Sequence, residues 1–105
     1  MFETGIHLSP EGFRELPERV QRLDVREPWE FALSKIPGAI LIPLGELANR
    51  VGELDPSRPI ALYCHHGVRS LQALRFLKGE GFTDLAHLSG GIDAYSLVDS
   101  AVPRY

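Results

Sequence analysis

Cysteine is nearly absent from the sequence. It contains one cysteine among 105 residues, which excludes an internal disulfide framework and a zinc or iron–sulfur site built from several cysteines. Its apolar runs, such as residues 39–42, are far shorter than the ~20 residues that span a bilayer. The first residues lack the basic and apolar regions of a signal peptide. We therefore expect a cytoplasmic protein without a membrane partner, in a compartment where a lone thiol stays reduced.

The chain also lacks a large excess of charge of either sign. Eleven Lys and Arg residues stand against fourteen Asp and Glu residues, which gives a net charge of −3. The chain has no basic stripe, so nucleic acid is not an expected partner. Hydrophobic residues make up 44% and charged residues 24%, a composition typical of globular proteins rather than disordered ones. The length predicts a single domain over residues 1–105.

Short apolar runs alternate with amphipathic stretches along the whole chain. The apolar runs predict strands at residues 6–8, 20–24, 39–42, 60–63 and 85–88. The amphipathic stretches predict a helix that opens at Ser9-Pro10, followed by helices at residues 28–34, 45–51, 70–80 and 91–97. Alternation of this kind is typical of an α/β fold with a mainly parallel sheet.

The segment most informative about chemistry is residues 63–70, Tyr-Cys-His-His-Gly-Val-Arg-Ser. It follows the most apolar strand and precedes the strongest helix, so it lies at the carboxyl edge of the sheet, where α/β proteins bind ligands. A loop this tight, with Gly67 at its centre, can turn successive backbone N–H groups inward to bind an anion. A cysteine at such a helix N-terminus ionises more readily than a free thiol. Cys64 is therefore the candidate nucleophile.

The other residues of this loop are candidate binding residues. Arg69 either attracts an anionic ligand or is a surface cation. The rings of His65 and His66 have two possible roles. Either they line the pocket, or they are exposed and the backbone amides of these residues contribute more to ligand binding than the rings do. Together with these three, the candidate substrate-binding set contains Gly67, Val68 and Ser70.

A metal site at this loop is not expected. Three consecutive residues, Cys64, His65 and His66, rarely converge on one tetrahedral ion, and no fourth ligand is suitably spaced. The two remaining histidines, His7 and His87, fall in or beside short strands, and we expect structural roles for them.

Three parts of the chain, taken in order, resemble the signatures of the rhodanese family of sulfurtransferases. They are residues 23–31 (Leu-Asp-Val-Arg-Glu-Pro-Trp-Glu-Phe) with 36–39 and 42–44, residues 63–70, and residues 81–82 with 88–95 (Leu-Ser-Gly-Gly-Ile-Asp-Ala-Tyr). The resemblance extends over roughly residues 6–95. Lys35 and Tyr95 depart from the pattern, in which His and Trp are usual. Both lie outside the loop, so they affect fine structure or partner contacts rather than the chemistry.

The resemblance implies a rhodanese-like three-layer fold, with a central five-stranded parallel sheet and helices on both faces. It also implies that Cys64 takes a sulfur atom from thiosulfate or a persulfide donor. A thiol, a dithiol or a sulfur-carrier protein then accepts that sulfur, and no cofactor is needed. Asp24 and Arg26, at a strand end, are expected to form a supporting ion pair or capping arrangement near the loop. Gly90-Gly91 predicts a tight turn into the last helix.

Two other interpretations remain open. Phosphatases related to this family, and arsenate reductases, also use a thiolate and an arginine. Those phosphatases have one more residue between the two than the four between Cys64 and Arg69, because a phosphoryl group needs more room than one sulfur atom. The second alternative is a rhodanese-like module that only binds a protein partner. Such modules typically lack the cysteine that this chain keeps.

Overall fold

Five short apolar segments form one parallel sheet at the centre of the fold. The structure is a computed structural model that describes residues 1–2 and 6–105. The strands are β1 (Ile6–Leu8), β2 (Gln21–Asp24), β3 (Ile40–Leu41), β4 (Ile60–Tyr63) and β5 (Leu85–Leu88). Their order across the sheet is β1-β5-β4-β2-β3, and each neighbouring pair is parallel. The predicted α/β fold with a parallel sheet is confirmed.

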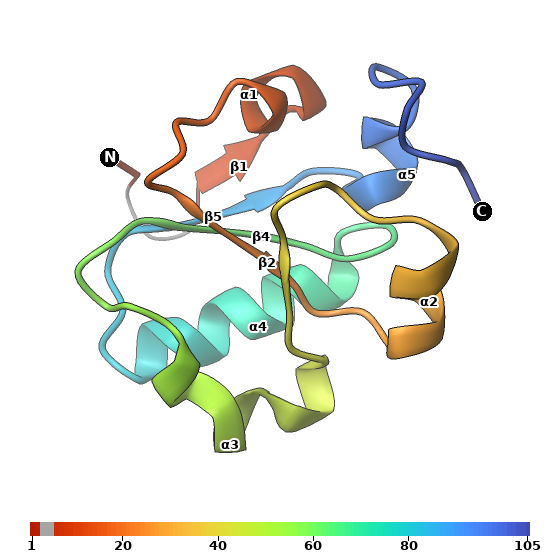
Figure 1. Cartoon of the computed structure of the whole chain (residues 1–105). Helices are drawn as coiled ribbons and strands as arrows, with labels where there is room; N and C mark the ends of the chain where they lie inside the picture. Colours follow the sequence, from red (N-terminus) through yellow and green to blue (C-terminus); the bar gives the residue numbers. More distant parts are fainter. Residues whose placement is uncertain (3–5) are drawn as a thin grey trace.

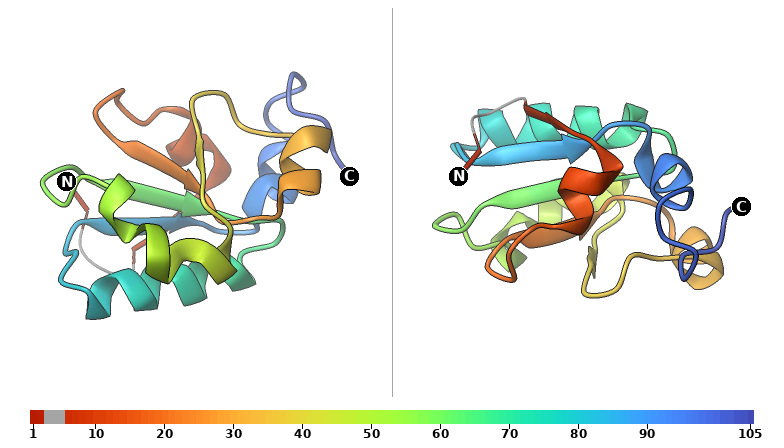
Figure 2. Two further views of the ribbon diagram at one scale, coloured as in Figure 1. Left: turned by 60° about the horizontal axis from the view of Figure 1, so that its bottom comes forward. Right: turned by 90° about the horizontal axis from the view of Figure 1, so that it is seen from above.

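Helices cover both faces of this sheet (Figures 1 and 2). The helical elements are α1 (Pro10–Arg14), α2 (Pro28–Leu33), α3 (Leu47–Arg50) between the short 3-10 turns η1 (Leu44–Glu46) and η2 (Val51–Glu53), α4 (Val68–Gly79) and α5 (Gly91–Tyr95). In Figure 1, α3 and α4 lie below the sheet and α1 and α5 above it. This is the three-layer arrangement that the resemblance to the rhodanese family implies.

Two hydrophobic cores result, one on each face. Alternate residues of a strand point to opposite faces, so β4 supplies both cores. Leu62 packs in the cluster that contains Leu74 of α4, whereas Tyr63 packs in the cluster that contains Phe13 of α1. All four residues of β4 are fully buried, as expected for a strand covered on both faces.

Several elements differ in extent from the prediction; β2, α2 and α5 are one or two residues shorter than expected. The expected strand at residues 39–42 is only Ile40–Leu41, because it is an edge strand that pairs with β2 alone. The expected helix at residues 45–51 is broken into η1, α3 and η2. The expected helix at residues 70–80 begins earlier, at Val68, because Gly67 takes a left-handed conformation, with φ of +110°, as its N-cap.

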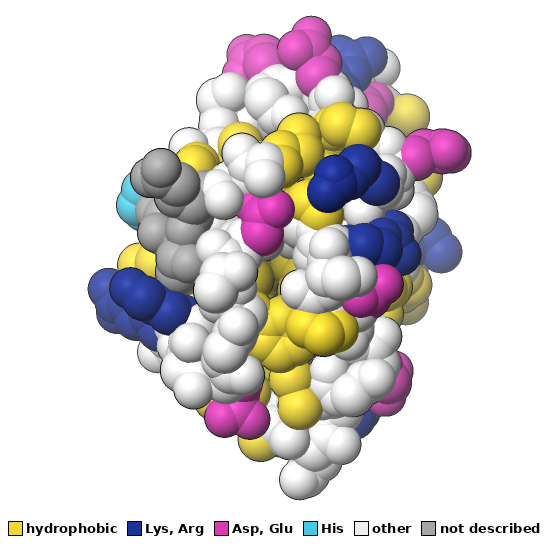
Figure 3. Space-filling view, turned by 90° about the vertical axis from the view of Figure 1, so that its left-hand side faces the viewer, with side chains coloured by type: hydrophobic (Ala, Val, Ile, Leu, Met, Phe, Trp, Pro, Cys, Tyr) yellow, Lys and Arg dark blue, Asp and Glu magenta, His cyan; other side chains and the backbone are white. Residues whose placement is uncertain are grey.

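The parallel strands bring their carboxyl ends to one edge of the sheet. Asp24 ends β2, and Cys64 directly follows β4. The opposite edge, where the strands begin, shows small apolar areas between charged side chains (Figure 3). Among the described residues, no helix is long and apolar enough to cross a membrane.

Candidate active site

The thiol of Cys64 lies between the end of β4 and the first turn of α4. The side chain is buried, and its Sγ accepts hydrogen bonds from the backbone N–H groups of Gly67, at 3.1 Å, and Ser70, at 3.3 Å. The positive φ of Gly67 aims these donors back at the sulfur. A sulfur anion here is stabilised by both hydrogen bonds and by the positive end of the α4 dipole. The site therefore suits a thiolate or a persulfide anion.

Arg69 lies in the first turn of α4 rather than in the loop, and it forms an ion pair with a buried carboxylate. Its two terminal nitrogens lie 2.6 and 2.9 Å from the carboxylate oxygens of Glu30 on α2. Glu30 raises the pKa of Arg69, and about a third of the Arg69 side chain remains exposed. Arg69 can thus meet a ligand at the edge of the site, but as one half of an ion pair and not as a free cation.

The two loop histidines form a stacked rim beside the thiol. The ring centroids of His65 and His66 are 4.0 Å apart, and the His65 ring stacks on Tyr105 at 4.1 Å. His66 is mostly exposed, with Nδ1 3.9 Å from a carboxylate oxygen of Asp93. Val68 is also exposed. Of the six candidate binding residues, Gly67 and Ser70 contact Sγ, whereas the others form the surroundings of the site.

Below the loop, Asp24 and Arg26 form the expected ion pair. An Arg26 Nη atom lies 2.7 Å from an Asp24 carboxylate oxygen, and both side chains are fully buried. Arg26 also donates to the backbone oxygen of Ser34 and to the hydroxyl of Tyr105. The Tyr105 hydroxyl in turn donates to Glu30 at 2.7 Å. One polar network therefore connects the end of β2, helix α2 and the Glu30–Arg69 pair.

The sequence profile of the rhodanese-like domain matches residues 9–97 of the chain. The chain belongs to the rhodanese family. The Bacillus subtilis protein YqhL is 42% identical over 84 residues, which cover 80% of this chain and 67% of YqhL. The Shewanella oneidensis thiosulfate sulfurtransferase GlpE is 34% identical over 91 residues, covering 85% of this chain and 90% of GlpE. The crystal structure of a rhodanese-related protein from Thermoplasma volcanium matches with a TM-score of 0.85 at 29% identity, covering 95% of this chain and 99% of that one.

Some other relatives of this rhodanese domain are much longer proteins. The chain spans 25%, 31% and 48% of three of them. The family therefore includes proteins in which a rhodanese-like region is one part of a larger chain.

The last signature of the rhodanese domain contacts the backbone of the loop that follows Cys64. Gly90 and Gly91 both have positive φ and form the predicted tight turn into α5. The first turn of α5 then caps the loop carbonyls, because Ile92 N–H donates to the Cys64 oxygen at 2.8 Å and Asp93 N–H donates to the His65 oxygen at 3.1 Å. The glycine pair therefore fixes where the loop lies, which sequence reasoning did not identify.

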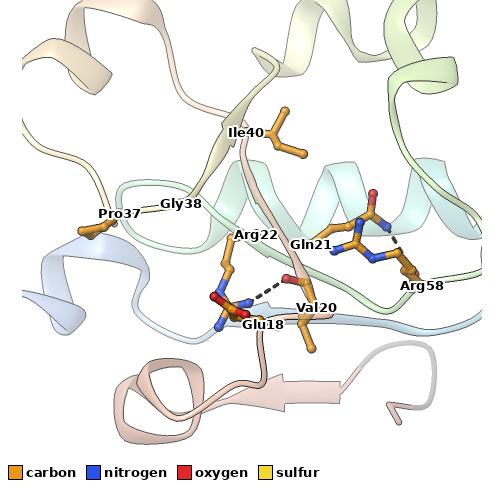
Figure 4. Close-up of a pocket in the computed structure, with 8 residues that line it drawn as sticks. All are labelled: Glu18, Val20, Gln21, Arg22, Pro37, Gly38, Ile40 and Arg58. Atoms are coloured by element: carbon orange, nitrogen blue, oxygen red, sulfur yellow. Dashed lines mark hydrogen bonds between the residues drawn. The ribbon is translucent and has the colours of Figure 1, made fainter.

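A pocket of about 470 Å³ lies at the other edge of the sheet, where β2 and β3 begin. Figure 4 shows its arginines, Arg22 and Arg58. Both donate to backbone oxygens, Arg22 to Leu16, Pro17 and Val20, and Arg58 to Arg19. These guanidinium groups therefore hold loops together at a distance from Cys64. Within residues 1–2 and 6–105, no group of three His, Cys, Asp or Glu side chains is placed to bind a metal ion.

Glu30 is a site residue that the sequence argument did not select. The available signal was its position three residues after Glu27, at a helix opened by Pro28, which is typical of an acidic capping residue. Arg69 lowers the pKa of Glu30 from 4.5 to about 2, against the opposing effect of burial. Because the pKa is lower in the folded protein, this stabilisation is complete above about pH 4.5 and is lost as the pH falls toward 2.

We therefore expect Glu30→Gln to weaken the dependence of the free energy of unfolding on pH between about 4.5 and 2. The free energy of unfolding, measured by urea titration across this pH range, should fall less steeply with decreasing pH in the variant than in the native chain. Glu53→Gln is the matched control, because Glu53 pairs with Arg50 in an exposed position where solvent screens the interaction. Equal slopes for Glu30→Gln and the native chain would contradict the assignment of this pH dependence to Glu30.

Proposed function

We propose that this rhodanese domain is a sulfurtransferase that carries a sulfane sulfur on Cys64. The observation that carries the proposal is the placement of Sγ at the N-terminus of α4 with two backbone N–H donors aimed at it. The name of the relative GlpE, a thiosulfate sulfurtransferase, supports thiosulfate as one donor. The acceptor is a thiol, a dithiol or a sulfur-carrier protein.

In the first step the Cys64 thiolate attacks the outer sulfur of thiosulfate. A new S–S bond forms, and the donor S–S bond breaks with its electron pair, which leaves with sulfite. The products are a persulfide on Cys64 and free sulfite. One difficult transfer is thereby divided into two displacements. The N–H groups of Gly67 and Ser70 stabilise the negative charge on sulfur.

In the second step a nucleophile removes the outer sulfur. Cyanide, for example, forms a C–S bond with it and leaves as thiocyanate, while the electron pair of the broken S–S bond returns to Sγ as a thiolate. The stacked rim of His65 and His66, with Tyr105 against it, lies beside this exchange. Together with the Glu30–Arg69 pair, it determines which acceptors reach the sulfur.

The proposal is tested by the intact mass of the protein after incubation with thiosulfate. We expect a gain of one sulfur atom, which cyanide removes and which Cys64→Ser does not show. Serine is nearly isosteric with cysteine, so a matching circular-dichroism spectrum and melting curve will verify that the variant is folded. The assay is repeated with a protein persulfide donor. Absence of a gain with both donors would exclude the sulfurtransferase, and hydrolysis of p-nitrophenyl phosphate or reduction of arsenate would then favour the phosphatase or reductase interpretation.

A further inference from the structure

A line of hydrogen-bonded side chains runs from the Cys64 thiol to the protein surface. Sγ lies 3.6 Å from the hydroxyl of Ser70, and that hydroxyl lies 3.1 Å from Nδ1 of His87. The hydroxyl also lies 3.2 Å from the backbone oxygen of Gly67, so its single proton rotates among these acceptors. The other ring nitrogen of His87, Nε2, lies 2.7 Å from Nδ1 of His7. Ser70 and His87 are buried, whereas His7 is exposed. The line therefore begins at a buried reactive atom and ends in solvent.

Three separate elements build this line, and the sheet order brings them together. Ser70 comes from α4, His87 from β5 and His7 from β1. The two histidines are directly paired in the ladder between the parallel strands β1 and β5. His87 interrupts a strand whose other residues are Leu85, Ala86 and Leu88, all fully buried. An imidazole in such a strand requires hydrogen-bond partners, and Ser70 and His7 supply one for each ring nitrogen.

His87 is suited to transfer a proton between its two neighbours rather than to remain protonated itself. Burial lowers its pKa, and the charge that His7 can carry lowers it further. A neutral imidazole has one nitrogen that donates and one that accepts, so it can receive a proton on one side and release another on the opposite side. Among the described residues, the titratable groups that face His87 are His7 on β1 and, through Ser70 of α4, the Cys64 thiol that follows β4.

The same line is consistent with both states of the sulfur. With a thiol, S–H donates to the Ser70 hydroxyl, the hydroxyl donates to Nδ1 of His87, and Nε2–H of His87 donates to His7. With a thiolate, the directions reverse, so that Nδ1–H of His87 donates to the hydroxyl and the hydroxyl donates to Sγ. Conversion of the first state to the second moves one proton along each link. One proton leaves Cys64, and one leaves Nε2 of His7 to water.

We propose that Ser70, His87 and His7 form a hydrogen-bonded relay that reverses direction as the thiol proton of Cys64 moves to the surface. The reversed relay holds the Ser70 hydroxyl as a donor to the sulfur anion and so stabilises the thiolate. Ser70 touches the reacting atom, and the two histidines act through it as positioning residues. The relay deepens the proposed function, because the thiolate that it produces is the nucleophile of the first step. The predicted structural role of His7 and His87 is thereby extended to the chemistry.

The relay is tested by the rate at which iodoacetamide alkylates Cys64 as a function of pH. Cys64 is the sole cysteine of the chain, and the reagent reacts with the thiolate. The variants are His87→Asn and His7→Asn, in which the shorter amide cannot contact both neighbours of the replaced ring and so no longer sets the direction of the Ser70 hydroxyl. Leu85→Ala is the control for general weakening of β5. Thiolate absorbance in the ultraviolet, corrected with Cys64→Ser, gives a second readout that needs no access to the thiol.

Both histidine variants should move the half-maximal pH upward by about one unit, because the Ser70 hydroxyl is no longer held as a hydrogen-bond donor to the thiolate. This shift corresponds to about a tenfold lower rate below the midpoint. At alkaline pH their rates should equal that of the native chain, and Leu85→Ala should keep the native midpoint. His7 is exposed, so His7→Asn remains informative if His87→Asn fails to fold. Superimposed profiles for His7→Asn and the native chain, or a loss of the same factor at every pH, would overturn the relay.

The mass assay with thiosulfate separates the relay from the proposed function. Shifted profiles without any uptake of sulfur would support the relay and exclude the sulfurtransferase. Uptake of sulfur with superimposed profiles would support the sulfurtransferase and exclude the relay.

Discussion

Replacing Gly91 with alanine is expected to lower the rate of sulfur uptake by Cys64 by more than about 100-fold, since displacement of a reacting group by 1 Å can have this effect. A Cβ atom on residue 91 would lie 2.3 Å from the backbone oxygen of His65 and 2.5 Å from that of Cys64. These atoms belong to the backbone of the loop, so no side-chain rotation relieves the overlap. The loop must move away from α5 and take the thiol with it.

The left-handed conformation of Gly91, with φ of +64°, adds a second cost. An L-residue in this conformation costs roughly 1–2 kcal/mol. We expect a lower free energy of unfolding by urea titration, with the loss of sulfur uptake persisting at temperatures where circular dichroism shows a folded chain. Gly79→Ala is the matched control, because Gly79 ends α4 with open space where a Cβ would lie. Native uptake in Gly91→Ala would mean that the position of the loop does not depend on this turn.

The parts of the fold that follow from local pattern could be predicted from the sequence. The segment at residues 60–63 is apolar throughout, and it is the strand β4, covered on both faces. Gly67 predicts a backbone turn that aims N–H groups inward, and it has a positive φ next to Sγ. Gly90-Gly91 predicts a turn, and a turn is present there. In each case a few adjacent residues determine the backbone conformation.

The parts of the site that depend on distant residues could not be predicted in the same way. Glu30 and Arg69 are 39 positions apart, and their pairing depends on where α2 lies relative to α4. His7 and His87 meet only because β1 and β5 are neighbours in the sheet. Periodicity identifies the strands but does not give their order. The stacking of His65 on Tyr105 likewise depends on the path of the chain after α5.

The buried ion pair under the site gives the second large prediction. Arg26→Met should lower the free energy of unfolding by roughly 3–5 kcal/mol, the usual effect of leaving one charge of a buried pair without its partner. The uncompensated group is the Asp24 carboxylate, which is fully buried. Burial disfavours the charged form of Arg26, yet its hydrogen bonds with Asp24 and Tyr105 raise its pKa above the ordinary value. Each charge is therefore stabilised by the other. Removal of Arg26 leaves the Asp24 carboxylate buried without that stabilisation.

Two further variants separate this explanation from a simple loss of packing. Arg50→Met removes the same side chain from an exposed position, where Arg50 pairs with Glu46 and Glu53, and should leave the urea midpoint nearly unchanged. The double variant Asp24→Asn with Arg26→Met should be more stable than Arg26→Met alone. The amide removes the buried charge and can still accept the N–H of residue 26, which now donates to Asp24 at 2.9 Å. The single variant Asp24→Asn completes the comparison. If the changes in the free energy of unfolding for Asp24→Asn and Arg26→Met simply add in the double variant, the loss comes from packing and not from an unpaired charge.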